Sequence, residues 1–248
     1  MSYLATMRVS LRLERTDMTE SQPPKAVLFL DFDGTITRRD VVDVILEMYA
    51  DPKWLVYEAA WRAGRMGSRD CLHAQMSLVR VTRQQLDSLL DSIAVDEGLI
   101  DLFKLCAAQT IPVHIISDGF DYFLNRILGR VLNGHRSLIK SVRASHLEVS
   151  SRPWRTQFPY FHEICRHGCA TCKPEVMRLL NPMKAPAVFV GDGLSDRYAV
   201  ECADLVFAKS ELARYCRANS IAHIEYQELT DVAARLQSLI SKDNESSI

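Results

Sequence analysis

The sequence has no long apolar run, no sustained block of one charge and no regular cysteine framework. No apolar segment approaches the roughly 20 residues that a membrane-spanning helix needs, so we expect none. A formal net charge of −1 and the absence of a basic block argue against nucleic-acid binding as the main function. An odd number of cysteines, seven in 248 residues, favours free thiols in a reducing cytoplasm.

The first 25 residues also lack the apolar stretch of a signal peptide. Charged residues interrupt them, and we expect residues 1–25 to be a flexible tail in which Met18 is an alternative start. With 48% hydrophobic and 25% charged residues, the chain has the composition of a soluble globular protein. Its length suits one large domain, or a core domain that carries a smaller one.

Apolar strand patterns alternate with helical patterns along most of the chain, which predicts an α/β fold. The predicted strands are 26–30, 112–116, 188–190 and 205–207, with a strand or hairpin within 138–149. The predicted helices are 97–109, 122–128, 175–180, 196–203, 211–217 and 230–241. We therefore expect residues 26–39 and 94–248 to form a Rossmann-like parallel sheet with helices on both faces.

Residues 40–93 contain no convincing strand and are predicted to form an inserted helical cap domain. Its helix signals are an apolar stripe over 41–49, a proline start at Asp51-Pro52, the Gly67-Ser68 pair and a Thr82/Gln85 capping box.

The segment Asp31-Phe-Asp-Gly-Thr35 is the most informative part of the chain, because it follows an apolar strand directly. Side chains of an extended chain alternate between faces, so Asp31 and Asp33 point the same way while Phe32 points into the core. Two carboxylates held that close are costly unless a cation or a proton lies between them. A strand that runs into an ordinary Asp-Gly turn is the alternative interpretation.

Three further segments follow in order: Ile115-Ile-Ser117, Lys173, and Gly191-Asp-Gly-Leu-Ser-Asp196. The strand-borne segments place polar residues at the carboxyl ends of predicted strands. In parallel α/β sheets, ligands bind outside these ends. The sequence therefore predicts one polar site at this edge of the sheet.

Together the four segments resemble those of the haloacid dehalogenase superfamily of phosphatases, with a C1-type helical cap inserted after the first. The resemblance covers the chain from about Val27 to the last helices. It implies a phosphoric monoester hydrolase that uses Mg²⁺ and acts on a small phosphorylated metabolite. The sequence indicates no oligomeric state.

This resemblance and the chemistry of the residues suggest the same roles. Asp31 would be the nucleophile that forms an aspartyl-phosphate. Asp33 would donate a proton to the leaving alcohol and then accept one from water. Mg²⁺ would be held by Asp31, the backbone carbonyl of Asp33 and Asp192.

The remaining motif residues would support this chemistry. Ser117 would bind phosphoryl oxygens or cap a helix, Lys173 would neutralise charge or be a surface lysine, and Asp196 would orient the metal ligands or be a first-turn acid. The loops expected to approach the phosphate contain Gly34, Thr35, Asp118, Gly119 and Gly193; Gly191 is a further turn glycine.

Two groups within the superfamily compete for the closest resemblance. Phosphoserine phosphatases hold the amino acid with an acidic residue, matched here by Asp40, and with a cap arginine, where this chain has Gln75. Glutamine does not pair with a carboxylate as arginine does. The 2-hydroxy-3-keto-5-methylthiopentenyl-1-phosphate phosphatases of methionine salvage are more similar in three segments: Asp118-Gly-Phe-Asp-Tyr-Phe123, Cys169-Ala-Thr-Cys-Lys-Pro174 and Asp204-Leu-Val-Phe-Ala-Lys209.

The cap residues expected to contact substrate are Asp40, Arg65, Arg69 and Gln75.

Two other hypotheses come from different classes of protein. A phosphate-accepting signalling module would also use a strand-tip aspartate, Mg²⁺, a hydroxyl and a lysine, but Asp33 favours turnover over a lasting phosphoryl state. A metal-binding interaction protein would use the ligands His162, Cys165, His167, Cys169 and Cys172. Their spacing matches no standard zinc finger, so reduced thiols near Lys173 are the preferred interpretation of this group.

Overall fold

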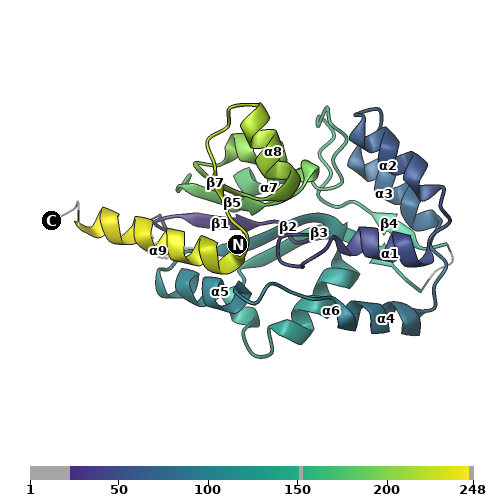
Figure 1. Ribbon diagram of the computed structural model, residues 1–248, viewed down its shortest axis with the longest axis horizontal. Coiled ribbons are helices and arrows are strands. Elements are labelled where there is room, and N and C mark those ends of the chain that lie inside the picture. The colour runs from purple at the N-terminus through teal and green to yellow at the C-terminus, as the bar shows by residue number, and fades with distance from the viewer. Residues whose placement is uncertain (1–22, 151–152, 246–248) are drawn as a thin grey trace, which may run out of the picture.

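The computed structural model describes residues 23–150 and 153–245, and its centre is a seven-stranded sheet (Figure 1). The predicted tail falls largely outside these residues. The sheet order is β4-β3-β2-β1-β5-β6-β7, and each neighbouring pair is parallel except β3 and β4. The strands are β1 (Val27–Leu30), β2 (Val113–Phe120), β3 (Ser141–Glu148), β4 (Arg155–Gln157), β5 (Ala187–Gly191), β6 (Leu205–Ala208) and β7 (Ile224–Glu225).

Helices cover both faces of the sheet, which confirms the predicted fold class (Figure 1). One face packs against α5 (Leu99–Ala108), α6 (Asp121–Val131) and α9 (Leu229–Glu245). The other packs against α7 (Lys173–Leu180) and α8 (Ser210–Ala218). Each face has its own apolar cluster because the central strands are buried on both sides.

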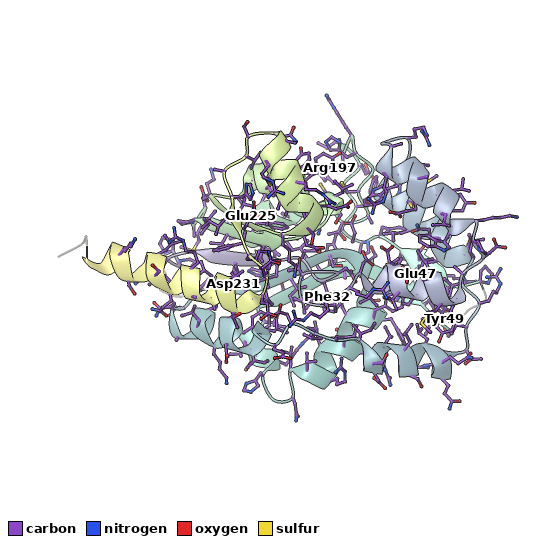
Figure 2. The ribbon with its side chains drawn as sticks, viewed as in Figure 1. Phe32, Glu47, Tyr49, Arg197, Glu225 and Asp231 are labelled. Atoms are coloured by element: carbon purple, nitrogen blue, oxygen red, sulfur yellow. The ribbon has the colours of Figure 1, made fainter. Side chains whose placement is uncertain are left out.

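The first apolar strand continues directly into the core. All four residues of β1 are buried, and Phe32, which is fully buried, lies near the centre of the molecule (Figure 2). By contrast, Glu47 and Tyr49 of the first helix lie toward the edge of the molecule in this view. Because Phe32 points into the core, we expect the side chains of Asp31 and Asp33, on either side of it, to point away from the core.

Residues 40–93 form four helices and contain no strand, and they lie to one side of the sheet (Figure 1). We call this segment the helical insert; its division from the core at 40 and 93 stays a prediction. The helices are α1 (Val41–Tyr49), α2 (Trp54–Arg62), α3 (Ser68–Ser77) and α4 (Arg83–Ser92). The capping box of Thr82 and Gln85 is present at α4. α2 begins at Trp54, because the Asp51 carboxylate accepts the amide of Lys53 and forms a turn before the helix.

The structure differs from the predicted elements in several places. β2 continues to Phe120, with a shift in register after Ile116. The helix predicted at 196–203 is wrong: the chain forms two short 3₁₀ turns, at 194–196 and 200–202. The carboxylate of Asp196 accepts the amides of Asp192 and Gly193, and these bonds hold a tight turn where a helix was expected. The short strand β7 was not predicted.

Two expectations about the chain as a whole can be compared with the described residues. No helix in the described ranges is long and apolar enough to cross a membrane. All seven cysteines are unpaired, which confirms the predicted free thiols.

Candidate active site

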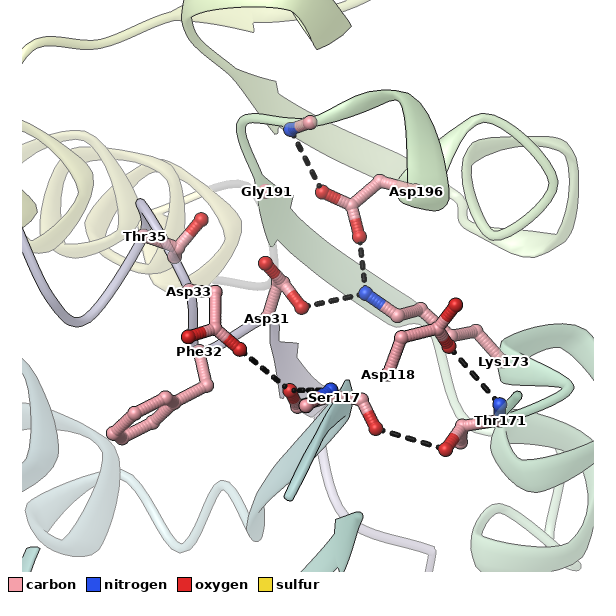
Figure 3. A network of polar contacts seen from close by, with 12 residues as sticks. Asp31, Phe32, Asp33, Thr35, Ser117, Asp118, Thr171, Lys173, Gly191 and Asp196 are labelled. Atoms are coloured by element: carbon pink, nitrogen blue, oxygen red, sulfur yellow. Dashed lines mark hydrogen bonds and ion pairs between the residues drawn. The ribbon is translucent and has the colours of Figure 1, made fainter. Parts of the chain in front are cut away.

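The carboxyl ends of β1, β2 and β5 bring three of the four sequence segments to one edge of the sheet, and α7 adds the fourth (Figure 3). Asp31 and Asp33 follow β1, Ser117 lies within β2, and Asp192 follows β5. Lys173 is the first residue of α7. The predicted site residues are therefore neighbours in space, although they are up to 165 positions apart, from Asp31 to Asp196 (196 − 31).

Lys173 joins two of the carboxylates (Figure 3). Its Nζ donates to Oδ1 of Asp31 and to Oδ1 of Asp196, both at 2.5 Å, and the side chain is 1% exposed. Burial lowers the pKa of Lys173, but the carboxylates of Asp196 and Asp31 outweigh burial and raise the pKa above its ordinary value. Lys173 is thus a buried cation rather than a surface lysine.

The pKa of Asp31 is raised well above its ordinary value by burial and by the neighbouring carboxylate of Asp196, against the opposing effect of Lys173. The site therefore holds more negative charge than its one buried lysine neutralises.

Asp33 is held by two donors on its other side. Its Oδ1 accepts the amide of Val41 at 3.0 Å and its Oδ2 accepts the hydroxyl of Ser117 at 3.1 Å. Burial raises the pKa of Asp33, although these hydrogen bonds oppose the shift. A carboxyl group with a raised pKa is suited to give and take a proton.

Ser117 has a role that differs from the alternative of a helix cap. Its Oγ accepts the amide of Gly119 at 2.8 Å and donates to Oδ2 of Asp33, whereas Phe120 occupies the N-cap position of α6, where no side chain caps the helix. A side chain at Gly119 would contact the carboxylate of Asp33 and the Ser117 hydroxyl, so glycine keeps this approach open.

Asp192 approaches the first motif directly. Its Oδ1 accepts the hydroxyl of Thr35 at 3.1 Å, and a Cβ at Gly34, where φ is +74°, would collide with its carboxylate. Burial and the charge of Asp196 raise the pKa of Asp192 to about 7. Carboxylate oxygens of Asp31, Asp192 and Asp196 lie within 4.8 Å of one another, close enough for one cation to contact them.

Two of the predicted loop positions, Asp118 and Gly193, form hydrogen bonds with other protein groups. Both carboxylate oxygens of Asp118 bond to protein groups, the hydroxyl of Ser68 and the amide of Thr171. The amide of Gly193 donates to Asp196, at 3.1 Å. Both residues also line the cavity that lies beside the carboxylates.

A cavity of about 180 Å³ opens beside these residues, between the sheet edge and the helical insert. Of the predicted insert residues, Asp40 and Gln75 line it, whereas Arg65 and Arg69 do not. The guanidinium of Arg69 instead lies over the ring of Phe161, 4.1 Å from its centroid.

Several lining residues were not predicted as site residues, and they include four charged ones: Asp43, Glu58, Arg62 and Glu211. Arg62 of α2 donates to Glu58 and to Glu211, both at 2.8 Å, so one arginine connects the insert to α8. Gln75 donates to the other oxygen of Glu58 at 3.2 Å. The i, i+4 spacing of Glu58 and Arg62 was visible in the sequence, but nothing there placed Glu211 beside them.

Comparison with known proteins agrees with this geometry. The family model for haloacid dehalogenase-like hydrolases matches residues 28–201, which include all four segments. The chain belongs to this family. The haloacid dehalogenase-like fold places its nucleophile candidate, Asp31, at the tip of the central strand β1.

The relatives of this hydrolase include named phosphatases. It is 28% identical to a 2-hydroxy-3-keto-5-methylthiopentenyl-1-phosphate phosphatase of Geobacillus thermodenitrificans, across 86% of this chain and 96% of the relative. A protein of the same name from Exiguobacterium is 24% identical, across 84% and 95%. These matches confirm the predicted enzyme class, a phosphoric monoester hydrolase.

Solved structures support the fold. A phosphoserine phosphatase captured as an analogue of its phospho-aspartyl intermediate superimposes with a TM-score of 0.66 at 18% identity, across 86% of this chain and 99% of the other. A substrate-bound phosphoserine phosphatase gives a TM-score of 0.65 at 18% identity, with 87% and 99% coverage. At these identities the likeness establishes the shared fold.

The cysteine and histidine group of this hydrolase lies behind Lys173. Cys165 interacts with the thiols of Cys169 and Cys172. Burial raises the pKa of Cys165, but hydrogen bonds from the amides of Cys169 and His167 outweigh burial and lower the pKa. Within the described ranges the aspartate trio is the group of ligand atoms near enough to share an ion, and these thiols and imidazoles form no comparable group.

Proposed function

We propose that this hydrolase is a Mg²⁺-dependent phosphatase that cleaves a small phosphomonoester through an aspartyl-phosphate on Asp31. The observation that carries the proposal is the different environment of the two aspartates of the first motif. Asp31 pairs with the buried cation of Lys173, whereas Asp33 accepts the hydroxyl of Ser117 and the amide of Val41. One carboxylate is thus suited to attack and the other to transfer protons.

The proposed reaction has two steps. First, an Asp31 carboxylate oxygen attacks phosphorus, the bond to the leaving oxygen breaks, and Asp33 gives that oxygen its proton. Then Asp33 takes a proton from water, the water oxygen attacks phosphorus, and the acyl-phosphate bond to Asp31 breaks. Lys173 offsets the charge of the carboxylates and of the transferring group throughout.

The donor set fits Mg²⁺, which prefers carboxylate and carbonyl oxygens. Asp31, Asp192 and the backbone carbonyl of Asp33 would hold the ion, and when bound it would neutralise charge on the transferring phosphoryl group. Asp196 already accepts Lys173 and the amides of Asp192 and Gly193, which suits a role in orienting the ligands.

The substrate proposal rests on the relatives and on the cavity. The named relatives make 2-hydroxy-3-keto-5-methylthiopentenyl-1-phosphate the first candidate. Phosphoserine is the alternative, and two observations disfavour it: Gln75, at the cap position where we expected an arginine, bonds to Glu58, and the charge of Arg62 is balanced by Glu58 and Glu211. The small cavity suits a compact leaving group in either case. The cytoplasmic location stays a prediction.

The test is phosphate release from a panel of small phosphomonoesters that includes both candidates. We expect EDTA to abolish turnover and Mg²⁺ to restore it, because the carboxylates lack enough positive charge without the ion. Unchanged turnover after thorough chelation would contradict the metal role. Phosphoserine as the best substrate of the panel would contradict the substrate proposal.

Substitution of the two aspartates separates their roles. Asp31→Asn should prevent both the phosphoenzyme and a beryllofluoride adduct. Asp33→Asn should slow turnover and, with a good leaving group, let the phosphoenzyme accumulate in acid-quenched samples analysed by mass spectrometry. An adduct on Asp31→Asn would show that the nucleophile is another residue. A wild-type phosphoenzyme as long-lived as that of Asp33→Asn would favour the signalling alternative.

A further inference from the structure

The carboxylate of Asp118 connects the helical insert to the loop that precedes Lys173. Its Oδ2 accepts the hydroxyl of Ser68, the first residue of α3, at 2.6 Å. Its Oδ1 accepts the amide of Thr171 at 3.0 Å (Figure 3). The same Ser68 hydroxyl accepts the amide of Ala170 at 2.9 Å. One serine and one aspartate thus satisfy two consecutive amides of the loop.

The loop is also bound to β2, the strand that carries Ser117. The hydroxyl of Thr171 donates to the carbonyl of Ser117 at 2.8 Å (Figure 3). Thr171 is 1% exposed and lies two residues before Lys173, which is also 1% exposed. A loop held at both Ala170 and Thr171 fixes where α7 begins, and therefore where the Lys173 side chain starts.

The insert approaches this loop at backbone distance. The amide of Arg69 donates to the carbonyl of Gly168 at 3.1 Å, and a Cβ at Gly67 would collide with that same carbonyl. No side chain lies between the two segments at this point. Movement of the start of α3 therefore acts directly on the loop that carries Lys173.

We propose that Asp118 is a positioning residue that couples docking of α3 to the placement of Lys173. This inference rests on the proposed function, in which Lys173 stabilises phosphoryl transfer at Asp31. Both carboxylate oxygens of Asp118 are bonded to Ser68 and Thr171, so we infer that it acts through these two residues. When α3 moves away, Oδ2 of Asp118 and the amide of Ala170 lose their partner in a largely buried setting, which is unfavourable. Asp31 therefore reaches full reactivity when α3 of the helical insert is docked against the loop that precedes Lys173.

The kinetic test weakens the link between α3 and the loop, the hydrogen bond from Ser68 to Asp118, by substituting each partner in turn. Ser68→Ala and Asp118→Asn should each slow phosphoenzyme formation from p-nitrophenyl phosphate about tenfold, measured by acid quench in a single turnover. The double variant should be no slower than the slower single variant, because both substitutions break the same link. Ser68→Thr retains the hydroxyl and should recover most of the rate.

Ser77 gives a matched control, since it lies at the other end of α3 and its hydroxyl bonds to Ala74 of the same helix. Ser77→Ala should behave like the wild type. Multiplicative losses in the double variant, or a wild-type rate in Ser68→Ala, would overturn the proposal.

A second measurement does not depend on activity. Hydrogen–deuterium exchange of residues 168–173 reports on the amides of Ala170 and Thr171, whose acceptors are Ser68 and Asp118. We expect faster exchange there in Ser68→Ala than in Ser68→Thr, with and without beryllofluoride. Equal exchange would contradict the link. A wild type without any phosphoenzyme, but with this exchange difference, would contradict the proposed function and leave the link intact.

Discussion

At the scale of single residues, the site is a balance of charge. Lys173 is buried between Asp31 and Asp196, and Asp192 adds a further carboxylate close by. Buried ions are tolerated when they are paired, and removing one partner leaves the other uncompensated. The lysine therefore serves stability as well as chemistry.

Lys173→Met should lower the free energy of unfolding by about 3–5 kcal/mol and abolish turnover, because Asp31 and Asp196 lose their buried partner. Urea unfolding and phosphate release measure the two effects. Lys104→Met, at an exposed position of α5, is the control and should change neither. A stable Lys173→Met protein would show that Lys173 does not hold the carboxylates together.

A second residue prediction concerns pH. His114 of β2 is 4% exposed, and burial, with smaller effects of Arg143 and Lys140, lowers its pKa from 6.5 to about 4. Between these values the unfolded chain binds a proton that the folded protein does not, so stability falls as the pH falls through this range. The loss from this one group is about 3 kcal/mol by pH 4.

The measurement is urea unfolding at several pH values between 7 and 4. His114→Phe should show a shallower loss of stability than the wild type, because phenylalanine has no proton to gain and retains the stacking on Phe29. His135→Phe, at an exposed position, should retain the wild-type slope. Identical slopes for wild type and His114→Phe would refute this assignment.

At the scale of elements, the helices of the insert are positioned by their first residues. Asp40 caps α1 by accepting the amide of Asp43, and it also lines the cavity. Thr82 caps α4 and exchanges hydrogen bonds with Gln85. Of these two capping residues only Asp40 also contributes to the wall of the site.

Thr82→Ala should cost about 1 kcal/mol of stability, because the amide of Gln85 loses its acceptor at the start of α4. Urea unfolding measures the loss. Thr82→Ser keeps a hydroxyl and should recover most of it. Since Thr82 does not line the cavity, phosphoenzyme formation should stay at the wild-type rate; a slower rate in a folded Thr82→Ala protein would mean that α4 controls the site.

At the scale of the whole molecule, the sheet and the insert contribute different groups to one cavity. The sheet edge supplies Asp31, Asp33, Ser117 and Asp192, which suit any phosphate ester. The insert supplies groups on the opposite side, where the leaving group would lie. Differences in how the insert binds the leaving group would select among substrates, while the chemistry at the sheet edge stays the same.

Gln75→Ala should therefore change the preference among phosphomonoesters several-fold, while phosphoenzyme formation from p-nitrophenyl phosphate should change little. Ratios of kcat/KM across the panel measure the preference. Arg65→Ala is the matched control, because Arg65 belongs to the insert but does not line the cavity. Equal substrate ratios for Gln75→Ala and the wild type would show that the insert does not select the substrate.

The sequence alone determined the α/β class, the helical character of residues 40–93 and the motif residues that meet at the candidate site. Short apolar strands followed by Asp31, Ser117 or Asp192 were sufficient, because parallel strands place their carboxyl ends at one edge. Phe32 lies in the core and Asp33 lines the cavity, as their positions after the apolar strand predicted. These are local regularities, so each could be predicted from a few neighbouring residues.

Only the tertiary structure decided which groups face each other across the cavity. Arg62 meets Glu211 across 149 positions, and Ser68 meets Asp118 across 50. Arg65 and Arg69 are in the same segment as Arg62, yet they do not line the cavity. Lys173 of α7 likewise meets Asp196 across 23 positions. Local propensity acts over a few residues, whereas these contacts depend on how the insert and the core pack together.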